Sequence, residues 1–350
     1  MANFDDMKLA VELLTGGKNT VKYDDLGMPS IMVEWPKQKN NALFTGGSDV
    51  VHPGSIVNGV EKTMYVGKYL SIIQNDRAYS LPGQEPAVSI NFDNALAKCR
   101  NKGRGWCLVP FSLQMQIALW CRKNGTMPRG NNNYRQDHSY THEKGRGMAV
   151  DGSNRITRTA TGSGPATWNH NWLPDGIADL NGNVNEWVAG MRTNGGEIQI
   201  IPNANCMDNE IPLTAASTYW KAIKASDGSL VDPGTSGTLK YDYQSSAVKL
   251  ISGTVQDDGS TYRGVSFTSM GKESDLTVPE IALALGLYPA DPSGDYGGDY
   301  RYIHVGGERI PYCGGDWNYG AYAGVFYVNG NHERSHPYDS IGFRSAFCEL

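Results

Sequence analysis

Residues 314–347 read GGDWNYGAYAGVFYVNGNHERSHPYDSIGFRSAF, and this stretch decides the fold. Two classes of residue alternate within it. One class suits a buried scaffold: apolar side chains, glycines that permit turns or close backbone approach, and arginines whose several donors can tie carbonyl groups together. The scaffold class comprises Gly315, Trp317, Gly320, Gly324, Phe326, Arg334, Gly342, Phe343 and Arg344.

The second class consists of Tyr, Asn, Asp, His and Ser side chains between those fixed positions. Tyrosine offers a large amphipathic contact area at low entropic cost, and small polar side chains offer adaptable hydrogen bonds, as in antibody binding surfaces. An ordinary surface strand can also be rich in Tyr and Asn, but the clustering favours a contact surface. The candidate ligand-binding residues are Asp316, Asn318, Tyr319, Tyr322, Asn331, His332, His336, Tyr338, Asp339 and Ser340.

The length, composition and charge of the whole chain limit the fold and function classes that are possible. Its 350 residues, with 42 Gly and 19 Tyr, predict two domains or one large domain with insertions, built from short strands and turns. A net charge of −5 without a basic patch argues against nucleic-acid binding. We find no signal peptide and no stretch long enough to cross a membrane. The six cysteines lack CxxC spacing, and we expect buried free thiols.

Apolar spacing and turn residues predict the main elements. Helices are expected over 5–14, 91–103 and 112–125, the last with Ser112 as N-cap and Gly125 as its stop. Strands are expected at 30–35 and at 64–73, the latter as one continuous strand. Residues 126–178 are predicted to be mostly loop. Residues 191–300 are predicted to alternate short strands and turns, with a helix at 278–287.

Two other motifs are explained more simply as loop and turn residues than as metal sites. His138 and His142 have the spacing of metal ligands on a helix, but their Gly- and Ser-rich surroundings favour solvated loop residues. The cluster Asp179, Asn181, Asn183 and Glu186 could supply oxygen ligands to a structural Ca²⁺. The alternative is a turn whose side chains satisfy backbone groups, and this reading is favoured. No cofactor is expected, and no catalytic triad is recognisable.

The tail resembles the variable region of diversity-generating retroelement target proteins. The resemblance rests on G-G-x-W-x-x-G-x-x-A-G-x-F, then R-S, then I-G-F-R-S-A. In that family, errors at the adenines of Asn codons randomise chosen positions, which excludes Lys, Glu, Gln, Met and Trp there. None of the candidate binding residues is one of these five types. Glu333 would break the rule and is left out, and Pro337 is undecided.

Two further segments, PAVSINFDNALAKCR (86–100) and DLNGNVNEWVAG (179–190), are similar to the formylglycine-generating-enzyme type of C-type lectin fold. The resemblance implies an α+β fold with two helices, many short strands and long loops. It implies a small N-terminal unit at 1–62 for virion attachment or oligomerisation. A lectin-like domain at 63–350 would follow, with an insertion around 191–305 and the variable region at 314–348.

The function implied is non-enzymatic binding of a host cell-surface receptor, protein or glycan, by a phage tropism protein. Such a protein would be made in the bacterial cytoplasm, reside in the virion and form a homotrimer. One alternative is a metal-dependent oxidase of the formylglycine-generating type. That enzyme class has Cys after Gly-Phe-Arg, whereas Ser345 stands here, and Tyr319 and Tyr322 occupy the tract of its cysteine pair. A purely structural virion protein is the third possibility.

Overall fold

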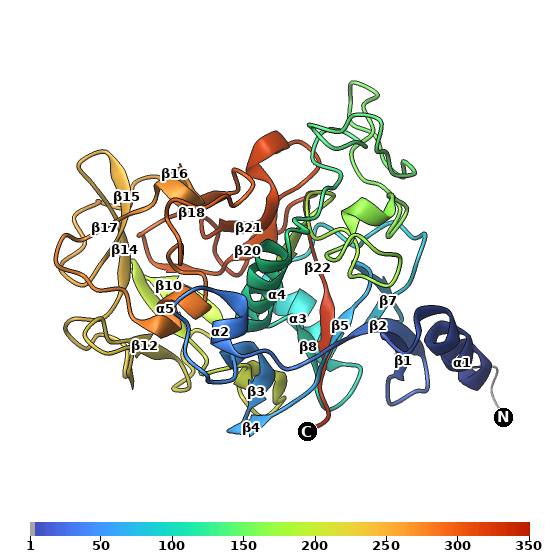
Figure 1. Ribbon diagram of the computed structural model, residues 1–350, viewed down its shortest axis with the longest axis horizontal. Helices are drawn as coiled ribbons and strands as arrows, with labels where there is room; N and C mark the ends of the chain where they lie inside the picture. Colours follow the sequence, from blue (N-terminus) through green and yellow to red (C-terminus); the bar gives the residue numbers. More distant parts are fainter. Residues whose placement is uncertain (1–3) are drawn as a thin grey trace.

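The structure, a computed structural model, describes residues 4–350. Within this range five α-helices form, and α4 is at the centre of the molecule (Figure 1). In the same view α1 lies at one end of the long axis and strands β12 to β17 lie at the other. The helices are α1 (Phe4–Thr15), α2 (Asn40–Leu43), α3 (Phe92–Arg100), α4 (Phe111–Asn124) and α5 (Glu280–Ala284).

Three larger sheets and two hairpins make up the strands of the described chain. The first sheet is β1 (Asn19–Tyr23), β2 (Pro29–Trp35), β5 (Met64–Gly67), β23 (Ser345–Phe347) and β8 (Trp106–Leu108), in that order. The second is β16 (Arg263–Ser266), β18 (Tyr300–Ile303), β21 (Gly324–Asn329), β20 (Tyr312–Gly314), β9 (Asn185–Trp187) and β22 (Ile341–Phe343).

The third sheet lies at the end of the molecule opposite α1. Its path is β13 (Leu230–Val231), β12 (Lys221–Ile223), β11 (Glu197–Ile200), β14 (Lys240–Gln244), β15 (Ala247–Ile251) and β17 (Gly271–Lys272), with β10 (Met191–Asn194) and β19 (Glu308–Arg309) paired beside it. The two hairpins are β3 (Ile56–Val57) with β4 (Val60–Glu61), and β6 (Ser71–Gln74) with β7 (Arg77–Ser80).

Several predicted elements are confirmed, and the structure shows how their ends are held. The predicted helix over 5–14 is α1, and the strand over 30–35 is β2. In α3 the Asn91 side chain accepts a hydrogen bond from the Asn94 N–H at 2.9 Å, which caps the first turn. Gly125 ends α4 in the left-handed conformation at φ 68°. All six cysteines are buried free thiols.

Three predictions of element boundaries are wrong. Ser112 is not the N-cap of α4: the helix begins one residue earlier, after Pro110, and the Ser112 hydroxyl donates to the Asn203 carbonyl at 3.0 Å. Residues 64–73 form two strands, because the chain leaves the first sheet after Gly67 and pairs with β7 instead. The helix predicted over 278–287 is limited to Glu280–Ala284.

The expected N-terminal unit shares a sheet with the rest of the chain. Strands β1 and β2 extend the sheet that contains β23, so hydrogen bonding continues across the expected boundary at residues 62 and 63. The expected insertion at 191–305 supplies most of the third sheet, and its strands β16 and β18 join the second sheet beside β21.

Arg344 links two sheets where the chain passes from β22 to β23. Its buried guanidinium donates to the Gly67 carbonyl in β5 at 2.9 Å and to the Glu186 carboxylate in β9 at 2.8 and 2.9 Å. A further bond reaches the Ala178 carbonyl at 2.8 Å. The arginine donates to every one of these buried acceptors, and its charge is paired with the Glu186 carboxylate. An apolar residue at this position would leave the acceptors without hydrogen bonds.

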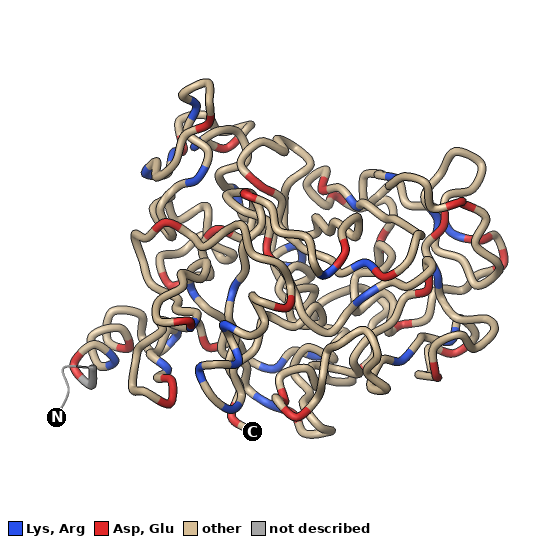
Figure 2. The backbone as a smooth tube through the Cα atoms, turned by 180° about the vertical axis from the view of Figure 1, so that it is seen from behind, with Lys and Arg blue, Asp and Glu red and all other residues tan. Residues whose placement is uncertain are grey.

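Charged residues are dispersed along the fold. Lys and Arg segments lie interspersed with Asp and Glu segments over the whole backbone (Figure 2). None of the helices in residues 4–350 combines the length and the apolar character needed to cross a bilayer.

Candidate binding surface

The tail runs through β20, a short 3-10 helix (Gly320–Tyr322), β21 and β22, and its scaffold residues hold this path. Trp317 is 6% exposed and packs with Leu70 and Val184. Phe326 and Phe343 are fully buried. These side chains fix the backbone from which the remaining tail side chains project.

Glycines are required in the tail for two different reasons. Gly315 and Gly320 have φ of +78° and +56°, which side chains with a Cβ rarely adopt. A Cβ at Gly324 would overlap the Asp299 carboxylate, and one at Gly342 would overlap the Ala87 carbonyl oxygen. Each glycine therefore permits a turn or a close approach that another residue would disturb.

Arg334 anchors the loop between β21 and β22. Its guanidinium donates to Glu308 at 2.8 and 3.0 Å, to Asp93 at 2.7 Å and to the Leu213 carbonyl at 3.1 Å. These contacts come from three separate parts of the chain, so Arg334 fastens the loop on its inner side.

An open pocket of about 360 Å³ lies on this surface, and half of the candidate binding residues line it. Tyr319 enters from the 3-10 segment, and Asn331, His332, His336 and Tyr338 from the loop before β22. The wall is completed by Tyr262, Tyr302, Tyr312 and Asn329.

The pocket is built from stacked rings. Tyr312, His332, His336 and Tyr338 form a column with successive ring centroids 5.8, 3.8 and 5.9 Å apart and interplanar angles of 14°, 2° and 16°. Tyr319 meets Tyr302 edge-on at 6.5 Å. Flat faces and ring edges are therefore presented side by side, the arrangement that stacks well on planar or apolar ligand surfaces.

The side chains lining the pocket are Tyr, Asn and His, with no Asp, Glu, Lys or Arg among them. Burial lowers the pKa of His332 to about 4, and His336 and Arg309 add to the shift. Burial also lowers the pKa of His336. Burial raises the pKa of Tyr302, Tyr312 and Tyr319, which keeps their hydroxyl groups protonated. The pocket can therefore bind by ring stacking and by hydrogen bonds from hydroxyl, imidazole and amide groups, without ion pairs.

Three candidate residues lie exposed outside this pocket: Asn318, Tyr322 and Asp339. Tyr322 is 46% exposed and packs on Tyr300 with ring centroids 4.0 Å apart. It extends the aromatic surface from the pocket toward the 3-10 segment.

Asp316 and Ser340 differ from the other candidates because each is only 4% exposed. The Asp316 carboxylate accepts hydrogen bonds from Asn185 Nδ2 at 3.2 Å and from the Asn318 N–H at 3.1 Å. The Asn185 N–H donates to the Ser340 carbonyl at 2.8 Å. Both side chains therefore lie beneath the surface, beside the scaffold residues, and direct ligand contact at these two positions stays a prediction.

Sequence reasoning missed Tyr262, Tyr302, Tyr312 and Asn329. Tyr262 and Tyr302 belong to the stretch expected to be an insertion, and only the parallel pairing of β18 with β21 brings them to the tail. The clue in the sequence is the alternation of Tyr300 and Tyr302 on a strand of a Tyr-rich chain. Tyr312 lies on β20 and Asn329 at the end of β21, and no residue pattern distinguishes them from other strand residues.

The turn at 179–186 has its polar side chains engaged within the chain. Asn181 and Asn183 accept from Asn132 and Asn131 at 3.1 and 3.2 Å, and Asp179 accepts from the Gly162 N–H at 2.7 Å. Both oxygens of Glu186 accept from Arg344. These partners lie outside the turn, so its side chains tie it to other segments of the chain.

Metal-binding residue types do not gather elsewhere in the described chain. Across residues 4–350, no three His, Cys, Asp or Glu side chains are close enough together to hold a metal ion. His138 lies in a loop with its Nδ1 3.2 Å from Asn132 Oδ1, and His142 is exposed.

No protein-family model matches the sequence, and no curated protein matches it. Solved structures do match over most of the chain. Treponema denticola variable protein 1 is 11% identical and covers 94% of this chain and 98% of its own, with a TM-score of 0.34.

The P3c and U1 variants of the Major Tropism Determinant are 10% and 11% identical and cover 95% and 94% of this chain. They cover 72% and 71% of their own chains, with TM-scores of 0.33 and 0.32. All three are named as a variable protein or as variants of a tropism determinant, and the tail of this chain resembles the variable region of such proteins. At these identities and TM-scores the matches carry no argument about ligand or activity.

Proposed function

We propose that this chain is a non-enzymatic receptor-binding protein of the retroelement-diversified type, with a C-type lectin fold related to the formylglycine-generating enzymes. One observation carries the proposal. Five side chains chosen from the sequence as diversified contacts converge on one open, tyrosine-lined pocket: Tyr319, Asn331, His332, His336 and Tyr338.

The way the loop is held supports diversification of its side chains. Backbone atoms of the loop make its fixed contacts: the Ile310 N–H donates to the His332 carbonyl at 3.0 Å, and the Ser89 N–H donates to the Tyr338 carbonyl at 3.0 Å. Arg158 Nη1 donates to the Asp339 carbonyl at 3.3 Å. A backbone carbonyl is present whatever the side chain, so substitutions at these positions leave the anchoring bonds in place. Exposed changes of this kind cost little stability.

The biological setting rests on the sequence resemblance. The proposal includes a host cell-surface receptor, protein or glycan, as partner, a virion location and a homotrimer. A trimer would add weak single contacts through avidity.

A binding experiment tests the pocket. Labelled protein is titrated onto a panel of intact bacterial cells, and the strain that binds wild type is used for Tyr319→Ala and Tyr338→Ala. Removing an aromatic anchor should weaken binding by about 1–3 kcal/mol, or roughly 5–150-fold, because aromatic side chains dominate interface hot spots.

Tyr219→Ala is the matched control, since Tyr219 is also an exposed tyrosine but lies outside the pocket. It should bind like wild type. Pocket variants that fold normally and bind as tightly as the control would contradict the assignment.

A further inference from the structure

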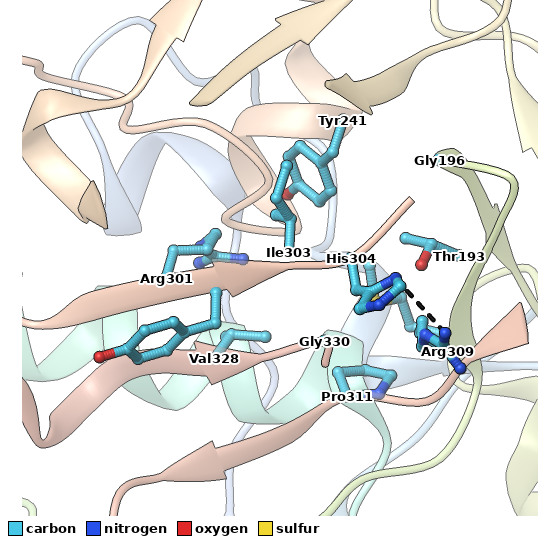
Figure 3. A pocket seen from close by; sticks show the side chains of 12 residues that line it. Thr193, Gly196, Tyr241, Arg301, Ile303, His304, Arg309, Pro311, Val328 and Gly330 are labelled. Carbon is cyan, nitrogen blue, oxygen red and sulfur yellow. Dashed lines mark hydrogen bonds between the residues drawn. The ribbon is translucent and has the colours of Figure 1, made fainter. Parts of the chain in front are cut away.

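A second, much smaller cavity lies between the second and third sheets. Its volume is about 20 Å³, and its walls include Thr193 of β10, Tyr241 of β14, Arg301 of β18, Arg309 of β19 and Val328 of β21 (Figure 3). A cavity needs roughly 10–15 Å³ by this measure to hold one water molecule. The space therefore suits a single water or a monatomic ion and excludes larger ligands.

Arg301 is the unusual wall residue because its charge is buried without a hydrogen-bond acceptor. The side chain is 1% exposed, and within residues 4–350 no acceptor is bonded to its Nε, Nη1 or Nη2 atoms. Its guanidinium lies 4.5 Å from the centre of the Phe267 ring, a contact that offsets part of the cost but supplies no counter-charge. A buried charge of this kind is costly unless it is paired.

The charges around the cavity have one sign. Arg309 is a second cation in the wall, and its Nε is also buried without an acceptor in the described chain. The outer side of Arg309 pairs with Glu333 at 2.9 Å, and its Nη2 lies 3.3 Å from His304 Nδ1, the contact drawn as a dashed line in Figure 3. The residues lining the cavity include two arginines and no Asp or Glu.

Two groups near Arg301, Asp299 just before β18 and Tyr241 on β14, have hydrogen-bond partners of their own. Burial raises the pKa of Asp299 well above its usual value, although Arg301 opposes the shift, and the carboxyl group accepts the Phe326 N–H at 2.7 Å. Burial also raises the pKa of Tyr241 against the lowering effect of the adjacent Arg301, and the Tyr241 hydroxyl donates to the Leu287 carbonyl at 2.9 Å. The cavity wall contains no carboxylate, so an anion that enters the cavity can pair with the positive charge of Arg301.

We propose that this cavity binds one small monovalent anion of the size of chloride, held by the Arg301 guanidinium with Arg309 adding attraction. The site is separate from the tyrosine-lined pocket and independent of the proposed function. A bound anion would join β18 of the second sheet to β10 and β14 of the third, and it would stabilise the packing of the two sheets.

Crystals of the full chain grown in bromide provide the direct test. The expected result is an anomalous-scattering peak in the cavity beside Arg301. A cavity that holds only water, or nothing, in bromide would overturn the proposal.

A solution measurement provides the second test, with melting temperatures compared in chloride and in gluconate at equal ionic strength. Gluconate is too large for the cavity, so wild type should melt roughly 1–3 °C higher in chloride when the anion is several times above its dissociation constant. Equal melting temperatures would contradict the site.

Arg301→Met should abolish the chloride effect and melt no lower than wild type in gluconate, because it removes an unpaired buried charge. Arg155→Met is the matched control: Arg155 pairs with Asp151 on the exposed surface, and this variant should keep the effect. If Arg301→Met does not fold, the bromide crystal of wild type still decides the question.

Discussion

The Asp316 carboxyl group lies at the base of the tail, where burial sets its chemistry. Burial raises its pKa to about 6, against the lowering effect of hydrogen bonds from the Asn318 N–H, Ser340 and Asn185. The Asn185 Oδ1 beside it is buried and lacks a hydrogen-bond donor among residues 4–350. A neutral group at position 316 that carries a donor would fit this site better than a carboxylate.

Asp316→Asn should therefore stabilise the protein at neutral pH. Because the folded pKa lies above the unfolded value near 3.8, the stability that Asp316 contributes is present below 3.8 and is lost as the pH rises through 6. The variant stays neutral, so it should be more stable than wild type by about 2–3 kcal/mol near pH 7.5 and nearly equal to it near pH 3.5.

Urea unfolding at the two pH values measures this difference. Asp275→Asn serves as the control because Asp275 is exposed and is not among the groups that shift the pKa of Asp316, so its stability should follow wild type at both. An Asp316→Asn protein that is less stable than wild type at neutral pH would show that the carboxylate is stabilised in the fold.

At the scale of elements, local signals predicted some features and not others: Gly125 ends α4 as expected, but Ser112 does not cap it. The Asn91 cap of α3 and the Gly125 stop of α4 are short-range features, and both could be read from the sequence. Parallel pairing of β22 with β9 and of β18 with β21 joins segments more than 20 residues apart, and no residue pattern specifies such partners. The change of path after Gly67 is local by contrast, since β6 pairs with β7 across a two-residue turn at Asn75 and Asp76.

Gly342→Ala tests the close packing of β22. A Cβ at this position would overlap the Ala87 carbonyl oxygen and lie 3.2 Å from Val184 Cγ2, so the backbone must shift. We expect a loss of about 1–3 kcal/mol in the free energy of unfolding, the usual cost of overpacking. Chemical denaturation measures it.

Gly152→Ala is the control for that substitution, because a Cβ there meets no atom within 4 Å. It should leave the stability close to wild type. Equal stability of the Gly342 and Gly152 variants would mean that the close approach of β22 to Ala87 is not maintained in solution.

At the scale of the whole molecule, the sequence located the tail side of the binding surface but not its other wall. Within residues 314–348 the sequence distinguishes scaffold residues from contact residues. It places Trp317 in the first class and Tyr319 in the second, and the structure buries Trp317 and brings Tyr319 to the pocket. Tyr262 and Tyr302 reach the pocket only through the order of strands in the second sheet. Burial of Asp316 and Ser340 depends on contacts with Asn185, far away in the chain, so it could not be read from the tail alone.

The central claim is that this surface is diversified while the scaffold beneath it is fixed. Deep sequencing of the 3′ end of the gene, in a population grown from the source element, tests it most directly. We expect substitutions concentrated at exposed or half-buried positions such as Asn318, Tyr319, Tyr322 and Tyr338, with Trp317 unchanged. A tail that is uniform across the population, or that varies evenly along its length, would contradict it.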